Sequence, residues 1–370
     1  MIETKEATKT TIASDNGVTV QMHKYDHEEV LFCNDNATGL KAIIAIHNTV
    51  LGPSLGGCRI WKYNNEQEAL NDVLRLSRGM TYKASVAGLN LGGGKSVIIG
   101  DAKTIKSEAL MRRFGRFVDD LGGKYITAED VGSSSRDMEY IHMETRHVTG
   151  IPESMGGSGD PSPVTAYGVW LGMKAAANEK WGSDSLKGKK VSVQGIGNVG
   201  IHLVKHLTDD GAKVYITDIN EARLKEVAKE YKAEVVSLDG IYDLDVDIYA
   251  PCALGATVNN DTLKRLKCSV IAGSANNQLA DEKVQGEALV KQGIIYAPDF
   301  VINSGGLINV YAELGGSYNK QRAMQHADKI YDITKEIFKL AKQENIATYL
   351  AANMVAEKRI DAIAKVKMNH

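Results

Sequence analysis

A glycine-rich stretch at Val191–Gly200 constrains the fold of this chain more than any other segment. A short β-branched run leads into the pattern Gly-x-Gly-x-x-Gly, and apolar residues at helical spacing follow it. A dinucleotide site requires this order of strand, tight turn and helix. Gly195 permits the turn, Gly197 lets the backbone approach a pyrophosphate, and Gly200 lets the helix pack closely on the strand. The pyrophosphate would lie at the helix N-terminus, where free N–H groups favour anions. An ordinary glycine turn in an α/β protein is the alternative interpretation.

An acidic residue at the end of the next apolar run narrows the choice of cofactor. Asp218 directly follows Val214–Thr217 and lies 18 residues after Gly200. A carboxylate at this place accepts hydrogen bonds from ribose hydroxyls and repels a 2′-phosphate, which indicates NAD. Arg223 lies near enough in the sequence to leave some use of NADP open.

Strand-like and helical segments alternate through the second half of the chain, which predicts a doubly wound parallel sheet. The strand-like runs are 191–194, 214–218, 235–236, 246–250, 269–272 and 294–297. One long helix is predicted over 319–342, and a Gly-, Ser- and Pro-rich segment at 155–163 marks a domain boundary. Since 370 residues exceed the usual size of one core, we predict two domains. They are a mixed α/β substrate domain, 1–150 with 343–370, and a Rossmann-type NAD-binding domain, 151–342.

Turn and glycine signals organise the first half of the chain. Two β-like runs, 30–33 and 40–50, flank turn-forming residues and predict a hairpin. Glycine-rich loops are predicted at 51–59 and 88–96, with a helix between them. The second loop does not fit a phosphate-binding P-loop, because Leu89 occupies the place of its first glycine and a strand follows where a helix is needed.

Composition and charge exclude several classes of protein. The net charge is −2 and no basic block occurs, so we expect no nucleic-acid partner. No apolar run approaches the roughly 18 residues of a membrane-spanning helix. The first residues lack the charged and apolar regions of a signal peptide, so we expect none. The four cysteines are too sparse for a disulfide framework. We therefore expect a cytoplasmic protein with reduced thiols.

Three ionisable side chains, Lys83, Lys95 and Asp130, are candidates for chemistry in a cleft between the two domains. A lysine beside glycines and an apolar strand is poorly solvated, and lost solvation lowers the lysine pKa, so that a neutral amine can act as a base. The alternatives are solvated surface charges for the lysines and a helix N-cap for Asp130. His202 and His206 are four residues apart but have no third ligand, so we expect a surface pair and no metal site.

Eight motifs together resemble the glutamate/leucine/phenylalanine/valine dehydrogenase family. They are Gly52–Arg59, Gly79–Lys83, Gly92–Lys95, Thr127–Gly132, Gly195–Gly200, Ala250–Ala253, Gly273–Gln278 and Val301–Gly306. The similarity is greatest to the leucine dehydrogenase branch. It implies an oxidoreductase that converts an L-amino acid, NAD⁺ and water reversibly to a 2-oxo acid, ammonium and NADH. It also implies a homo-oligomer that acts in branched-chain amino-acid catabolism.

The resemblance implies roles for individual residues. Lys83 would bind the substrate carboxylate, Lys95 would activate the water that attacks the imine, and Asp130 would exchange protons with the amino group. The other implied substrate contacts are Leu55, Gly56, Gly57, Ala128, Asn276, Asn303, Leu307 and Val310. The implied cofactor contacts are Gly195, Gly197, Asn198, Val199, Gly200, Asp218, Thr165, Ala250, Cys252 and Asn276.

The implied side-chain pocket separates the branches of the family. The glutamate branch has a lysine where this chain has Leu55, which disfavours glutamate as a substrate. Ala128 resembles the leucine branch, whereas Leu307 resembles the phenylalanine branch. The main hypothesis is therefore oxidative deamination of leucine, and also of valine and isoleucine. The alternatives are a phenylalanine dehydrogenase and a non-catalytic NAD-binding sensor.

Overall fold

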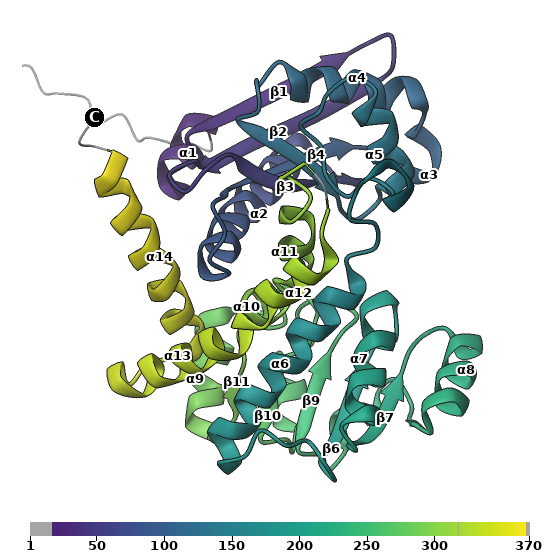
Figure 1. Ribbon diagram of the computed structural model, residues 1–370, viewed down its shortest axis with the longest axis vertical. Coiled ribbons are helices and arrows are strands. Elements are labelled where there is room, and N and C mark those ends of the chain that lie inside the picture. Colours follow the sequence, from purple (N-terminus) through teal and green to yellow (C-terminus); the bar gives the residue numbers. More distant parts are fainter. Residues whose placement is uncertain (1–16, 317, 368–370) are drawn as a thin grey trace, which may run out of the picture.

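The computed structural model describes residues 17–316 and 318–367 and contains two α/β domains, each built on its own sheet (Figure 1). The first sheet is mixed and has the order β1-β2-β4-β3-β5. Its strands are β1 (Glu29–Asp35), β2 (Leu40–Asn48), β3 (Ser54–Trp61), β4 (Gly92–Ile99) and β5 (Tyr125–Glu129). Strand β2 is antiparallel to both β1 and β4, whereas β3 is parallel to both β4 and β5. The predicted hairpin is therefore confirmed as β1 and β2.

The second sheet is parallel throughout and has the order β11-β10-β9-β6-β7-β8. Its strands are β6 (Lys190–Gln194), β7 (Lys213–Thr217), β8 (Glu234–Val235), β9 (Ile248–Pro251), β10 (Val270–Ile271) and β11 (Ile295–Tyr296). The strand order reverses direction between β6 and β9, which is the kind of place where open α/β sheets bind ligands. The predicted doubly wound parallel sheet is confirmed.

Helices cover both sheets. Those before β6 are α1 (Val18–Tyr25), α2 (Glu66–Val86), α3 (Ala102–Ile105), α4 (Glu108–Asp119), α5 (Ser135–His142) and α6 (Ser162–Trp181). Those between β6 and β11 are α7 (Asn198–Asp209), α8 (Glu221–Tyr231) and α9 (Glu282–Gln292). The last five are α10 (Asp299–Ile302), α11 (Gly305–Tyr311), α12 (Lys320–Ala327), α13 (Lys329–Glu344) and α14 (Thr348–Lys367). Short 3₁₀ helices lie at Glu153–Met155, Gly240–Asp243 and Thr262–Lys264.

Most glycines of the two predicted glycine-rich loops lie in strands, so the prediction of loops over these positions is wrong. Strand β3 includes Gly56 and Gly57, and β4 begins at Gly92. These glycines are needed for close approach of backbones. A Cβ atom on Gly56 would lie 1.7 Å from the carbonyl oxygen of Gly94, and one on Gly93 would lie 2.2 Å from the backbone nitrogen of Thr81. A glycine cluster usually marks a turn, and here it marks contact between neighbouring elements.

The C-terminal part of the chain also differs from its prediction. The segment 319–342, expected as one helix, contains α12 and most of α13, which are separated at Asp328. The carboxylate of Asp328 accepts a hydrogen bond of 2.6 Å from the hydroxyl of Tyr167 on α6. Such a tertiary contact leaves no signal in the spacing of apolar residues.

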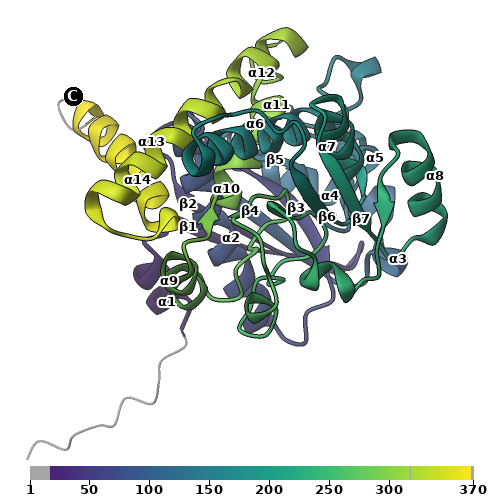
Figure 2. The ribbon, with the colours of Figure 1, turned by 90° about the horizontal axis from the view of Figure 1, so that it is seen from below.

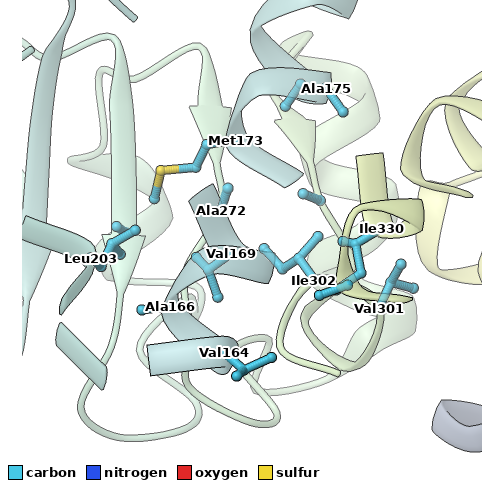
Figure 3. Packing of buried hydrophobic residues seen from close by; sticks show 14 of the residues in the cluster. Val164, Ala166, Val169, Met173, Ala175, Leu203, Ala272, Val301, Ile302 and Ile330 are labelled. Carbon is cyan, nitrogen blue, oxygen red and sulfur yellow. The ribbon is translucent and has the colours of Figure 1, made fainter. Parts of the chain in front are cut away.

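A buried helix, α6, forms the centre of the second domain's core (Figure 3). Its side chains Val164, Val169 and Met173 pack against residues of α7, α10 and α13, among them Leu203 and Ile302. Full burial of each such aliphatic side chain stabilises a fold by about 1.5–3 kcal/mol. The core therefore fixes α10, which carries one wall of the cleft described below, against the parallel sheet.

Helix α14 links the two domains. It packs against α2 of the first domain and against α13 and β11 of the second, and the hydroxyl of Ser85 on α2 donates a hydrogen bond of 2.7 Å to the carbonyl oxygen of Ala356. Figure 2 shows α14 and α8 on opposite sides of the molecule. The two edge strands of the second sheet, β11 and β8, therefore have different helices near them. We propose the domain division 1–150 with 343–370 and 151–342, of which 1–16 and 368–370 lie outside the described residues.

No helix in the described parts of the chain combines the length and the apolar character that crossing a membrane demands.

The contact between β4 and α2 predicts a large difference between two glycine substitutions. Gly93→Ala would force a Cβ atom to within 2.2 Å of the Thr81 backbone, and overpacking of this kind costs about 1–3 kcal/mol or more. Gly79→Ala, on α2, meets no atom within 4 Å and should gain up to about 1 kcal/mol from helix propensity. Thermal unfolding of both variants checks this expectation. Equal unfolding midpoints would contradict the proposed role of Gly93.

Candidate active site

A cavity of about 390 Å³ lies between the two domains and gathers the predicted ionisable residues. The first domain contributes Lys83 from α2, Lys95 from β4 and Asp130, which directly follows β5. The second domain contributes Asn276 and Asp299. Residues that are distant in the sequence therefore meet in one cleft, as the sequence analysis predicted for Lys83, Lys95, Asp130 and Asn276.

Local structure explains how the two lysines reach the cleft. Helix α2 begins after Asn65, whose side chain accepts a hydrogen bond of 2.9 Å from the backbone N–H of Glu68. Lys83 lies in the last turn of this helix. Lys95 lies in β4, which has β2 on one side and β3 on the other. Because Gly93 brings β4 against α2, the helix end and the strand present their lysines to the same cavity.

Lys95 and Asp130 form a close ion pair. The Lys95 Nζ atom lies 2.5 Å from Asp130 Oδ2, and the side chains are 8% and 19% exposed. Burial by itself would raise the pKa of Asp130, but the neighbouring charges of Lys95 and Arg59 hold that pKa below its usual value. Asp130 is thus an ionised carboxylate next to a buried amine, and not the N-cap of α5, since Ser134 occupies that position.

Burial perturbs the titration of Lys83, which lies at the end of a helix and not in the setting of glycines and an apolar strand for which poor solvation was expected. Burial lowers the pKa of Lys83 to about 8, and the carboxylate of Asp299 acts in the opposite direction. The ammonium group donates a long hydrogen bond of 3.4 Å to Asn276 Oδ1. The same oxygen accepts a bond of 2.9 Å from the amide of Asn303. Asn303 Oδ1 is buried and has no hydrogen-bond partner among the described residues, so this atom is available to a ligand.

Asp299 is a site residue that the sequence analysis missed. It is 7% exposed, and it accepts hydrogen bonds of 3.0 Å from the N–H of Gln278 and 2.6 Å from that of Phe300. Burial raises the pKa of Asp299, against the effects of these N–H groups and of Lys83. Asp299 follows the apolar run 294–297. That signal, an acid just after a strand, is the one that singled out Asp130 and Asp218.

The glycine turn of the second domain has the shape expected for a dinucleotide. Gly195 has φ +99°, which favours glycine, and a Cβ atom on Gly200 would lie 2.2 Å from the carbonyl oxygen of Gly195. A Cβ atom on Gly197 would meet nothing within 4 Å, which leaves space in front of the N-terminus of α7. Asp218 accepts hydrogen bonds of 2.8 Å from the N–H of Ile196 and 2.9 Å from that of Asn220. These residues fit a dinucleotide, with the acid held beside the turn.

The remaining predicted cofactor contacts lie near the same edge of the sheet. Ala250 and Cys252 are at the end of β9, next to β6, and the Cys252 N–H donates a bond of 2.8 Å to the carbonyl oxygen of Gln194. Asn198 and Val199 begin α7. Thr165 lies in the first turn of α6, and its hydroxyl donates to the carbonyl oxygen of Pro161 at 2.9 Å. Arg223 donates a long bond of 3.3 Å to the side chain of Asn198.

The predicted side-chain pocket is apolar and buried. Leu55, Leu307 and Val310 belong to one hydrophobic cluster, and each is less than 9% exposed. Ala128 is also buried and lies opposite Gly57 in the register of β5 and β3. These four side chains do not border the cavity that the two lysines share. Their contact with a substrate therefore stays a prediction.

One of the two histidines of α7, His206, takes part in packing. The ring of His206 stacks on that of Trp170 with 5.5 Å between the centroids, and burial lowers the pKa of His206. The described residues contain no group of three or more His, Cys, Asp or Glu side chains that could hold a metal ion.

Comparison with known proteins places this geometry in context. Residues 27–147 match the family described as Glu/Leu/Phe/Val dehydrogenase, dimerisation domain, and residues 156–220 and 215–367 match Glutamate/Leucine/Phenylalanine/Valine dehydrogenase. A leucine dehydrogenase of Thermoactinomyces intermedius is 56% identical over 94% of both chains. A phenylalanine dehydrogenase of Caldalkalibacillus thermarum is 45% identical over 92% of this chain and 93% of its own. The crystal structure of L-tryptophan dehydrogenase from Nostoc punctiforme superposes with a TM-score of 0.82 at 45% identity, covering 94% of this chain and 99% of that one.

The environment of Lys83 predicts unusual reactivity. Because only a neutral amine attacks an acylating reagent, Lys83 should reach half-maximal modification near pH 8, where its pKa lies, and not near the roughly 10.4 of an ordinary lysine. Brief competitive labelling with acetic anhydride over a pH series, read by mass spectrometry of each lysine peptide, measures this midpoint. A midpoint for Lys83 above pH 10 would contradict the effect of burial.

Proposed function

The chain belongs to the Glu/Leu/Phe/Val dehydrogenase family and is an amino-acid dehydrogenase, and we propose that it deaminates leucine, valine and isoleucine with NAD⁺. The products would be the 2-oxo acids, ammonium and NADH, in a reversible reaction. One observation carries this proposal: the Lys95–Asp130 ion pair lies in the same cavity as the poorly solvated Lys83. A non-catalytic NAD sensor would not need this arrangement.

The proposed mechanism assigns one task to each polar group of the cleft. The Lys83 ammonium binds the substrate carboxylate, and the amides of Asn276 and Asn303 orient the substrate. NAD⁺, when bound, supplies the hydride acceptor. Asp130 takes a proton from the substrate ammonium, so that the neutral amine can lose hydride from the α-carbon and become an iminium. Water attacks the iminium carbon while Lys95 takes a proton from that water. Asp130 then returns its proton to the nitrogen, the carbon–nitrogen bond breaks, and the departing ammonia takes the hydroxyl proton, which leaves the 2-oxo acid and ammonium. Lys95 finally releases its proton to solvent.

The positive charge of the iminium would favour the neutral form of Lys95, which is the form that accepts the proton. The short distance between Lys95 and Asp130, 2.5 Å, allows the two groups to exchange that proton directly. The low exposure of Lys95, 8%, limits competition from bulk water. The geometry thus supports paired acid and base roles for the two residues.

The substrate proposal rests on the apolar side-chain pocket that the resemblance implies. Leu55 offers no charge for a γ-carboxylate, so a glutamate side chain would be buried without a partner. The leucine dehydrogenase relative is 56% identical, against 45% for the phenylalanine dehydrogenase. This difference in identity supports branched-chain substrates over aromatic ones. A phenylalanine dehydrogenase is the second candidate, because Leu307 resembles that branch.

We also propose NAD as the cofactor and a homo-oligomer in the cytoplasm as the working state. Asp218 supports NAD, since its carboxylate is held beside the glycine turn by two backbone N–H groups. The matched family is described as having a dimerisation domain, which supports self-association. The four cysteines are all free, which suits a reducing compartment. We expect no nucleic-acid or membrane partner.

Removal of each lysine should have a different kinetic effect. Lys95→Ala should lower kcat by about 10²–10⁴-fold, the usual contribution of a general base, with NADH binding intact. Lys83→Ala should chiefly raise KM for the amino acid, because Lys83 pairs with a carboxylate present in ground and transition states alike. Lys106→Ala is a matched control, since Lys106 also lies 2.5 Å from an aspartate, Asp137, but outside the cleft. Full activity of Lys95→Ala would refute the mechanism.

The role of Asp218 predicts the choice between NAD⁺ and NADP⁺. The wild type should prefer NAD⁺ in kcat/KM, and Asp218→Ser should narrow that preference by removing the repulsion of the 2′-phosphate. Asp245→Ser serves as the control, because Asp245 is a solvent-exposed acid in the same domain. Equal use of both cofactors by the wild type would remove Asp218 from the ribose site.

A panel of amino acids tests the proposed substrates. Leucine, valine and isoleucine should react within about two orders of magnitude of one another, because one methylene in an apolar pocket is worth about 10–200-fold. Alanine should be poor, glutamate poorer still, and phenylalanine weak because the methyl group of Ala128 takes space from a ring. Ala128→Gly should raise the phenylalanine-to-leucine ratio. A wild type that prefers phenylalanine would favour the second candidate.

A further inference from the structure

Arg59 joins the ion pair of the cleft and, like Lys83, borders the cavity. It lies on β3, two residues after Gly57, and its side chain is 21% exposed. Its Nε atom is 3.3 Å from Asp130 Oδ2, the same oxygen that Lys95 contacts at 2.5 Å. Two cations of different chemistry therefore share one carboxylate oxygen.

A second acid, Asp72 on α2, holds Arg59 in place. Asp72 Oδ2 accepts hydrogen bonds of 2.9 Å from Arg59 Nη1 and 2.8 Å from the hydroxyl of Tyr63. Asp72 Oδ1 accepts a bond of 2.9 Å from Arg75. With three donors on it and only 16% exposure, Asp72 is a fixed anchor for the guanidinium group.

The difference between the two cations matters during the reaction. Lys95 has to be neutral when it takes a proton from water, and at that moment it no longer balances the charge of Asp130. A guanidinium group keeps its proton throughout the range in which proteins are stable. Arg59 is thus the cation near Asp130 whose charge does not change during turnover.

We propose that Arg59, anchored by Asp72, is a positioning residue that keeps Asp130 ionised in the free enzyme, ready to take a proton from the substrate, and holds it oriented while Lys95 changes its protonation state. This inference rests on the proposed function. Arg59 borders the same cavity, and its assigned role is to act on the reaction through Asp130. The pair Asp72–Arg59 then forms the outer part of the acid–base machinery.

Other groups around Asp130 also influence its protonation, and the test has to take them into account. The titratable or charged groups that face it or interact with it electrostatically are Lys95 of β4, Arg59 and Cys58 of β3, Lys83 of α2, Tyr63 and Tyr125. Of these, Lys95 and Arg59 form ion pairs with Asp130. An opposite charge within about 4–6 Å lowers the pKa of an aspartate by about 1–3 units.

The test is the pH dependence of kcat/KM for leucine in the wild type, Arg59→Met, Arg59→Gln and Arg59→Lys. Loss of the positive charge should move the acidic limb upward by roughly one pH unit or more. The limb moves upward because a carboxylate without its counter-charge binds a proton at higher pH. Arg59→Lys keeps the charge and should show less than half of that shift. In Arg59→Gln the new amide can still donate a hydrogen bond to Asp72. This variant therefore tests the proposal if Arg59→Met does not fold.

Arg75→Gln is the matched control. Arg75 pairs with Asp72 at 2.9 Å and forms no ion pair with Asp130 among the described residues, so its removal should leave the acidic limb in place. An Arg59 that only supports the fold would lower kcat equally at every pH. An acidic limb of Arg59→Gln that coincides with the wild type would overturn the proposal.

A second measurement separates this inference from the proposed function. A double-mutant cycle of Arg59→Gln and Asp130→Asn, read by thermal unfolding at pH 7, should show non-additive midpoints because the two side chains interact. Additive midpoints would overturn the inference even for an active enzyme. If the wild type oxidised no amino acid, the proposed function would fail while the cycle still tested the interaction of Arg59 with Asp130.

Discussion

The close approach of β4 to its neighbours is the constraint on which the cleft depends. Side chains cannot fit between β4 and β3 at Gly56, or between β4 and α2 at Gly93, because a Cβ atom there would overlap a backbone atom. Both contacts join elements that carry charged site residues. The glycines thus set the distance between Lys83 at the end of α2 and Lys95 in β4. The packing of one domain on the other would not set this distance by itself.

Desolvation then gives the two lysines different chemistry. Lys83 has only a distant hydrogen bond to Asn276, and burial dominates its pKa. Lys95 is buried as well but lies against Asp130, whose negative charge offsets the cost of burying an ammonium group. Lys83 would pair with an incoming carboxylate, whereas Lys95 would exchange a proton with its neighbour. The two amines therefore have distinct tasks. The position of one aspartate separates them.

Three acids share a common placement in the fold. Asp130 follows β5, Asp218 follows β7 and Asp299 lies just beyond β11, and each of these strands is parallel to its neighbour. The carboxyl ends of parallel strands meet at one edge, where chains turn away and ligands bind. Each of the three is fixed by backbone N–H groups or by cations. Both sheets therefore present oriented carboxylates to the cleft from opposite sides.

The sequence by itself determined the parallel sheet, the dinucleotide turn and the candidates Lys83, Lys95 and Asp130 of the cleft, because these depend on local rules: strand spacing, glycine dihedral angles, and charged residues beside glycines or at a strand end. Only the tertiary structure decided that the glycines of β3 and β4 lie in strands, since that depends on which backbone lies opposite them. It also decided that Asp299 faces Lys83 and that Arg59 and Lys95 share Asp130. Some of these pairings join residues more than 200 positions apart. Their strength comes from the exclusion of water, which no local sequence pattern records.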